Sequence, residues 1–234
     1  MPVATVVILI ASLLCQSGPP VPTSADIDAA GVLARAIRAA GGLEALQNAR
    51  VVTWRGRATV RDGARTIPIE GRWRLEPHDR ATVVAWASGQ PESSARTMTL
   101  NGSIGTLEHE GKTTAMPPET VAARRDHFYL YWVLTLEPLR DPGVVLTPLV
   151  AEGARGLKVE RRGRPDVEIF FDRSWRPTHL RARVADPAGE GGILEELRFE
   201  GTVASRGVRW PARIRIYHSG VLVKDLDVLE FAVS

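Results

Sequence analysis

Beyond residue 50, most of the chain alternates apolar and polar residues with a period of two. The alternation is clearest over residues 52–60 and 67–75, where tryptophan, valine and leucine alternate with arginine, threonine and glutamate. Asp62-Gly63 and Asn101-Gly102 are strong hairpin turns between such segments. One apolar and one polar face are typical of antiparallel sheet with one side in water. The other segments with this strand pattern are 81–86, 96–100, 104–109, 112–116, 144–151, 157–161, 167–172, 178–185, 193–203, 208–217 and 221–233.

Only two regions have the spacing of three and four that predicts helices. The first covers residues 26–40, ends at Gly41-Gly42 and is followed by a further helical turn or two over 43–49. The second covers residues 117–136 and is apolar nearly all round from His127 onward. It continues into the stretch FYLYWVLTLEPLRDPGVVL (128–146), whose apolar part is shorter than the ~20 residues that span a bilayer. This helix could be an ordinary core helix, a lid over an apolar cavity or a partner-binding surface.

These elements predict a mainly β (α+β) fold with one domain over residues 26–234. We expect a single curved antiparallel sheet of about eleven strands. The N-terminal helix and the central helix would plug its concave face. Because two or three helices cannot easily fill the hollow of so wide a sheet, a cavity on the concave side is expected.

The N-terminus predicts export. Residues 2–14 are apolar and uncharged, and a polar, proline-rich stretch follows and ends at Ala25. Thr23-Ser24-Ala25 fits the small-x-small cleavage pattern, so residues 1–25 are predicted to be a signal peptide and the mature protein to be periplasmic. An alternative is a lipid anchor on Cys15, the single cysteine.

Charge adds little evidence for a charged partner. The formal net charge is +3, and all but three of the 30 basic residues are arginines interleaved with acids. No basic stripe with aromatics is present, so nucleic acid is not an expected partner. Arg213 and Arg215 are expected to pair with Asp225 and Asp227 across neighbouring strands. Residues 155–183 carry nine basic and four acidic groups, and 184–200 carry one and five, which leaves open a docking face for a membrane or an envelope protein.

The sequence has no recognisable catalytic, metal or cofactor motif. The five histidines lack ligand spacing, and Glu195 and Glu196 point to opposite faces of a strand. Gly-x-Ser-x-Gly and Ser-x-x-Lys are both missing, and the glycine-rich stretch 101–105 precedes no helix. We therefore predict no catalytic residue, no metal and no cofactor. An enzyme would instead require clustered polar groups inside the cavity.

Several stretches resemble exported bacterial proteins with the lipoprotein-carrier (LolA/LolB-like) half-barrel fold, in an uncharacterised periplasmic branch. They are AAGGLEAL (39–46) with VVTWRGRATV (51–60), the central stretch 128–146, VEIFFDRSWRPTHLRARV (167–184) and FEGTVASRGVRWPARIRIY (199–217). The resemblance covers most of residues 27–233. It implies a bent antiparallel sheet around an apolar cavity that holds acyl chains in the best-known members.

The leading functional hypothesis is a non-enzymatic binding protein, expected to be a monomer, that holds a lipid, a lipoprotein acyl chain or another apolar ligand. Each buried methylene contributes ~0.8 kcal/mol, so such a ligand needs no conspicuous polar contact. The alternative is a structural or protein-interaction module of the cell envelope whose core is filled by its own side chains. The predicted cavity-lining residues are Trp54, Trp73, Trp86, Phe128, Trp132, Leu136 and Trp210.

Overall fold

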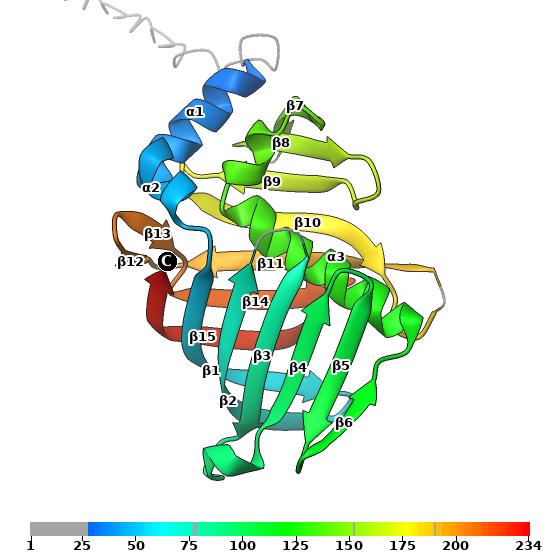
Figure 1. Cartoon of the computed structure of the whole chain (residues 1–234). Coiled ribbons are helices and arrows are strands. Elements are labelled where there is room, and N and C mark those ends of the chain that lie inside the picture. The colour runs from blue at the N-terminus through cyan, green and yellow to red at the C-terminus, as the bar shows by residue number, and fades with distance from the viewer. Residues whose placement is uncertain (1–27, 77–78, 152, 190) are drawn as a thin grey trace, which may run out of the picture.

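The computed structural model describes residues 28–234 except 77–78, 152 and 190. Its main feature is one open antiparallel sheet of 13 strands in the order β6-β5-β4-β3-β2-β1-β15-β14-β11-β10-β9-β8-β7 (Figure 1). The strands of this sheet are β1 (Val52–Asp62), β2 (Arg65–Glu76), β3 (Arg80–Ala87), β4 (Arg96–Asn101), β5 (Ile104–His109), β6 (Lys112–Ala115), β7 (Val144–Ala151), β8 (Ala154–Arg161), β9 (Val167–Phe171), β10 (Pro177–Ala185), β11 (Gly192–Glu200), β14 (Arg213–His218) and β15 (Val221–Val233). The predicted fold class is confirmed, with slightly more strands than expected.

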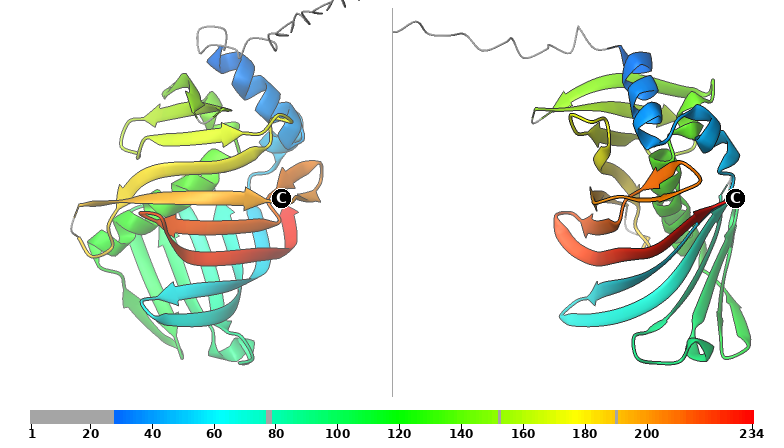
Figure 2. Two further views of the ribbon diagram at one scale, coloured as in Figure 1. Left: turned by 180° about the vertical axis from the view of Figure 1, so that it is seen from behind. Right: turned by 90° about the vertical axis from the view of Figure 1, so that its left-hand side faces the viewer.

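The first and last strands meet in the middle of the sheet. β1 pairs with β15 from Val52↔Val233 to Val60↔Lys224, with a bulge after Arg55. The N-terminal strands β1–β6 therefore form one wing and the later strands the other. The wings curve towards each other without closing, as the side view in Figure 2 shows. A strand meander with a single helical interruption builds the whole sheet, because antiparallel neighbours need only tight turns.

The helices occupy the concave side and one end of the sheet. They are α1 (Ala29–Ala40), α2 (Leu43–Asn48) and α3 (Pro118–Leu134), with short 3₁₀ turns η2 (Glu92–Ser94) and η3 (Glu137–Arg140). α3 crosses the concave face and packs against β10, β9, β4 and β5. The Asp126 carboxylate accepts a hydrogen bond from the Ala185 backbone N–H at 2.9 Å and helps to hold α3 on β10.

Two predicted segments differ from the structure in their bounds. The central helix ends at Leu134, because Leu136 takes a left-handed backbone conformation with φ of 63°. The expected strands 193–203 and 208–217 are each interrupted, and β12 (Val203–Ser205) and β13 (Val208–Trp210) form a separate two-stranded sheet. Gly201, with φ of 64°, and Pro211 cause the interruptions, since proline cannot donate to a sheet ladder.

The hydrophobic core lies between the inner face of the sheet and the helices α1 and α3. From α3 it includes Leu130, Tyr131 and Val133, which are at most 2% exposed. They pack against inward residues of both wings, such as Leu75 and Leu197. A helix that is apolar nearly all round must be covered on most sides, and the bent sheet provides that cover.

Candidate functional site

The structure brings five of the seven predicted lining residues together under α3. Trp54, Trp73, Phe128, Leu136 and Trp210 are at most 5% exposed and belong to one core cluster. Tyr131 lies at its centre, with its ring centroid 5.4 Å from that of Trp54 and 6.4 Å from that of Trp210. Trp54 also packs against Trp73 and Trp210, and Phe128 packs against Tyr131, whereas Leu136 follows the end of α3 and shares only the core cluster with them.

The other two predicted lining residues lie elsewhere. Trp86 stands opposite Glu70 in the β2–β3 register, whereas Trp73 stands opposite Val83. Successive strand residues point to opposite faces, so Trp86 lies on the outer face of the sheet, although it is only 7% exposed and was predicted to line the cavity. Trp132 is partly buried and lines a pocket at the end of α3.

This end pocket has a volume of about 760 Å³ and lies between α2, the C-terminal half of α3, η3 and residues near β8. Its apolar lining comes from Leu46, Tyr129 and Trp132. Most of its charged lining is internally paired. Asp79 binds Arg164 and lies 3.6 Å from Arg125, and Asp141 binds Arg161 at 3.0 Å. The Arg164 guanidinium also lies over the Tyr129 ring.

α3 leaves part of the concave face uncovered. The strand registers align Phe231, Trp54, Trp73, Val83, Met98 and Leu107 in one inward row across β15, β1, β2, β3, β4 and β5. Along this row the exposed fraction rises from 2% at Trp54 to 43% at Leu107. Six residues further along β1 and β2, another inward row places Lys224 beside Val60 and Val60 beside Ile67, which is 39% exposed.

We refer to the uncovered apolar residues as the inner strip, which consists of Val60, Ile67, Ile69, Val83, Met98 and Leu107. By their register with the buried inward residues of the same strands, all six face the hollow of the sheet. All are partly or largely exposed. Partly exposed apolar side chains that gather on a concave face are typical of a binding surface.

A polar cluster that no sequence motif announced lies beside the inner strip. Glu195 of β11 is 3% exposed and bridges two histidines. Its Oε1 lies 2.7 Å from Nδ1 of His127 on α3, and its Oε2 lies 2.9 Å from Nε2 of His218 on β14. The cluster thus joins the central helix to the later wing of the sheet.

The environment keeps Glu195 ionised and favours neutral His127. Burial disfavours the Glu195 carboxylate, but the two imidazoles outweigh this effect and hold its pKa well below the usual range. Burial also lowers the pKa of His127, against the attraction of Glu195. Neutral His127 can satisfy both conditions by donating its Nδ1–H to the carboxylate. Desolvation likewise raises the pKa of the neighbouring Tyr131 hydroxyl.

Two cations lie next to this cluster. Lys224 of β15 is partly buried, and burial, together with the nearby Arg124, lowers its pKa to about 8. Arg124 is exposed on the face of α3 that carries His127 one turn later. Within the described part of the chain, neither cation has an ion pair or hydrogen bond, and Glu195 is the carboxylate whose field favours both.

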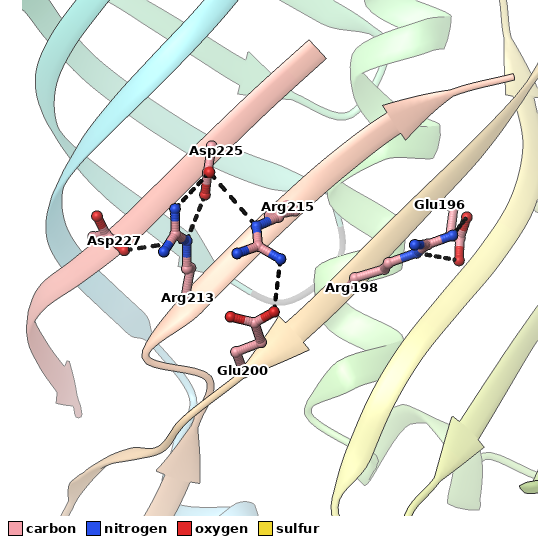
Figure 3. A network of polar contacts seen from close by, with 7 residues as sticks. All are labelled: Glu196, Arg198, Glu200, Arg213, Arg215, Asp225 and Asp227. Carbon is pink, nitrogen blue, oxygen red and sulfur yellow. Dashed lines mark hydrogen bonds and ion pairs between the residues drawn. The ribbon is translucent and has the colours of Figure 1, made fainter. Parts of the chain in front are cut away.

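On the outer face of the same strands, in contrast to Arg124 and Lys224, the arginines are paired with carboxylates (Figure 3). Arg213 binds Asp225 with two hydrogen bonds of 2.7 and 2.6 Å, as the sequence predicted. Arg215 binds Glu200 at 2.7 Å, and Arg198 binds Glu196 through two nitrogens. These arginines are paired in a polar surface network.

A second pocket, of about 470 Å³, lies on the outer face of the sheet, and its arginines are also paired with carboxylates. It is lined by three arginines of β1 and β2. Arg55 lies 3.5 Å from Glu230, Arg72 binds Glu92, and Arg74 lies 2.8 Å from Glu76. Paired surface charges of this kind contribute little binding energy.

The sequence contained one signal for the buried cluster, charged residues at inward strand positions, which a search for ligand spacing or catalytic pairs does not detect. Glu195 occupies an inward position between Ile193 and Leu197, and Lys224 occupies one between Leu222 and Leu226. A charged residue at an inward strand position requires a partner or a solvated hollow. Which residues meet Glu195 depends on the path of α3, because His127 lies 68 positions away in sequence.

The chemistry available at the cluster is limited. Both carboxylate oxygens and one nitrogen of each histidine are used in mutual hydrogen bonds. Across the residues with described positions, neither histidine binds a hydroxyl or thiol, so the cluster lacks an activated nucleophile. Those residues also contain no group of three or more side chains suited to hold a metal ion. None of the described helices is long and apolar enough to cross a membrane.

An open half-barrel with a helix across its concave face is also the fold of several solved structures. A domain named as an outer membrane lipoprotein-sorting protein, from Vibrio parahaemolyticus, is 10% identical over 88% of this chain and 94% of its own, with a TM-score of 0.56. A LolA superfamily protein from Nitrosomonas europaea is 11% identical over 89% and 94%, with a TM-score of 0.53. A DUF1329 family protein from Desulfovibrio piger is 8% identical over 88% and 93%, with a TM-score of 0.54.

These similarities show that the chain has a LolA-like fold, and the resemblance inferred from the sequence is confirmed at this level. The identities are too low to extend the similarity beyond the fold. No family model matches the chain, and no curated protein matches it in sequence.

Proposed function

We propose that this protein is an exported, non-enzymatic binding protein that holds an acyl chain of a lipid or lipoprotein against the concave face of its half-barrel. The observation that carries the proposal is the inner strip, an apolar surface that α3 leaves partly exposed. Its residues Val83, Met98 and Leu107 continue the row of Trp54 and Trp73, so a chain bound there would extend that core outward. Trp54 and Trp73 stand in the same inward row as Val83 and support this placement, whereas Trp86 faces outward and is left out.

Other evidence supports the proposal without testing it. The solved structure from Vibrio parahaemolyticus is named for lipoprotein sorting, and it shares the fold. The predicted signal peptide over residues 1–25 lies outside the described residues and is consistent with a site of action in the cell envelope. The Glu195–His127–His218 cluster is the kind of polar grouping that an enzyme would require, but both carboxylate oxygens are already in hydrogen bonds with the histidines, and the larger exposed surface beside it is apolar.

Uptake of a fluorescent fatty acid by delipidated mature protein tests the proposal. We expect saturable binding to the wild-type protein and co-purification of acyl lipids in native mass spectrometry. Leu107→Asp places a charge on the inner strip and should weaken binding about tenfold or more, because it removes the contact of a Leu-sized apolar group. Ile104→Asp is the matched control, since Ile104 is on the same strand, is 67% exposed and faces outward. Equal loss in both variants, or no binding to the wild type, would contradict the proposal.

A second candidate function is a structural or protein-interaction module of the envelope with a filled core. The burial of Trp54, Trp73, Phe128, Leu136 and Trp210 in mutual contact favours it. This alternative predicts no co-purifying lipid and no effect of fatty acids on the melting temperature. The fatty-acid binding experiment described above therefore separates the two functions.

A further inference from the structure

On the inner face of the sheet, basic side chains lie next to the apolar inner strip. Lys224 stands beside Val60 in the β1–β15 register, and Val60 is the first residue of the inner strip. Arg96, exposed at an inward position of β4, stands opposite Ala85. Adjacent strands lie ~4.8 Å apart, so the apolar strip begins about one strand away from the Lys224 side chain.

Arg124 and Lys224 form a cation pair at one end of this strip. Arg124 projects from α3 one turn before His127, which lies 2.7 Å from Glu195, and Lys224 pairs with Ile216, which pairs with Leu197 two residues after Glu195. Both cations therefore lie near the Glu195 carboxylate, and the charge of Arg124 lowers the pKa of Lys224. Two like charges that face a hollow repel each other, and an anion between them would relieve this repulsion. The outward arginines, by contrast, already have carboxylate partners.

Within the described ranges of the chain, no carboxylate forms an ion pair with Arg124 or Lys224. Glu195 is the carboxylate that influences both cations, and both of its oxygens already accept hydrogen bonds from His127 and His218. Asp225 and Asp227, on the same strand as Lys224, point to the outer face and bind Arg213. Among the described carboxylates none is left to pair with the two cations, so we look to a ligand for the negative charge.

We propose that Arg124 and Lys224 bind the anionic head of an amphiphile, a carboxylate or a phosphate, whose alkyl chain lies on the inner strip. This inference rests on the proposed binding function and adds the class of ligand, an anionic lipid. A guanidinium and an ammonium suit this role, because charge-assisted hydrogen bonds to oxyanions are short and strong. Val60 and Ile67, next to Lys224, would accept the first part of the chain, and Ile69 the part that follows.

Calorimetric titration of the mature protein with laurate and with dodecanol tests the inference, because the two share one alkyl chain and differ in the head. We expect laurate to bind about tenfold or more tightly than dodecanol, from the hydrogen bonds to the charged head. Arg124→Gln with Lys224→Gln should abolish this preference and leave dodecanol affinity unchanged. Arg57→Gln with Arg61→Gln removes two outward charges and should keep it. Arg124→Gln alone changes an exposed side chain and covers the case in which the Lys224 change disturbs folding.

Each outcome decides a separate point. Equal binding of laurate and dodecanol to the wild type would overturn the head-group inference and leave the proposed function standing. Failure of both to bind would overturn the proposed function itself. Inorganic phosphate alone is expected to bind weakly. If phosphate bound as tightly as laurate, the site would be one for free anions, which would contradict the role of the alkyl chain. If the Arg57→Gln, Arg61→Gln control also lost the preference for laurate over dodecanol, the assignment to Arg124 and Lys224 would be refuted.

Discussion

Glu195 is an inward carboxylate that the fold satisfies with two histidines from other elements. Removal of one partner of such a buried ionic contact typically costs about 3–5 kcal/mol, because the remaining charge is left uncompensated. Its contacts with His127 and His218 join α3 to β14, so the cluster stabilises the position of the helix on the sheet. At the residue scale, this cluster is the most specific tertiary feature of the concave face.

The lowered pKa of His127 predicts a loss of stability on acidification. An unfolded histidine titrates near pH 6.5, so below that pH the unfolded chain binds a proton that the folded chain excludes. The free energy of unfolding should therefore fall as pH decreases from 6.5, by at most about 1.4 kcal/mol per pH unit for this one proton. Urea titrations between pH 7.5 and 5.5 measure this slope above the range where carboxylates titrate.

His127→Asn is the informative variant, because the amide retains a donor near the position of Nδ1 and cannot take up a proton. We expect a shallower pH dependence than in the wild type. His109→Asn, on the β5–β6 hairpin, serves as the control and should retain the wild-type slope. Parallel curves for wild type and His127→Asn would show that His127 does not titrate as inferred.

At the scale of elements, α3 determines what the concave face can bind. Its first half carries three polar residues with different roles. Asp126 accepts a hydrogen bond from β10, His127 donates one to Glu195, and Arg124 has no ion pair with any residue that the structure describes. Its second half is apolar and buried. The helix thus covers the later wing closely and leaves the inner strip of the first wing partly open.

The end of α1 gives a test of how the N-terminal helix docks. Gly41 has φ of 128°, and a Cβ there would lie 2.0 Å from the Gly207 carbonyl oxygen in the β12–β13 turn. Gly41→Ala should therefore lower the free energy of unfolding by about 3 kcal/mol or more, through backbone strain and overpacking. Gly63→Ala has φ of 57° and meets no atom within 4 Å, so it should cost only about 1 kcal/mol. Urea unfolding compares the two, and equal costs would contradict the close contact between α1 and the turn.

At the scale of the whole molecule, the sheet separates two chemical environments. Its outer face is covered with paired charges, and its inner face carries the aromatic core, the inner strip and a few unpaired cations. Because β1 pairs with β15, the two wings share a continuous hydrogen-bonded centre and curve around α3. A single ligand surface can therefore collect residues from both ends of the sequence.

The predicted signal peptide is tested by the intact mass of the protein exported from a bacterial host. We expect cleavage after Ala25, a mature chain that begins at Asp26, and recovery in the periplasmic fraction. Cys15→Ala should not change that mass. Recovery in the membrane fraction with a lipid-sized mass increase, lost in the Cys15→Ala variant, would instead support the lipid anchor.

Much of the fold could be predicted from local patterns. The period of two, the Asp-Gly and Asn-Gly turns and the glycines after the first helix indicated most strands, the hairpins and the helix end. The pairing of Arg213 with Asp225 also followed, because neighbouring strands in a hairpin have a predictable register. The site was less predictable. Trp86 was placed on the inner face by its apolar character alone, and the β2–β3 register puts it outside.

The sequence by itself determined the class of fold, the apolar central helix and the apolar inner row, because these depend on periodicity within short segments. Only the tertiary structure decided which residues meet across the hollow. His127, Glu195, His218 and Lys224 come from three strands and a helix, and their encounter depends on the curvature of the sheet and the path of α3. Curvature and helix placement arise from the packing of the whole chain, so no local pattern could specify them.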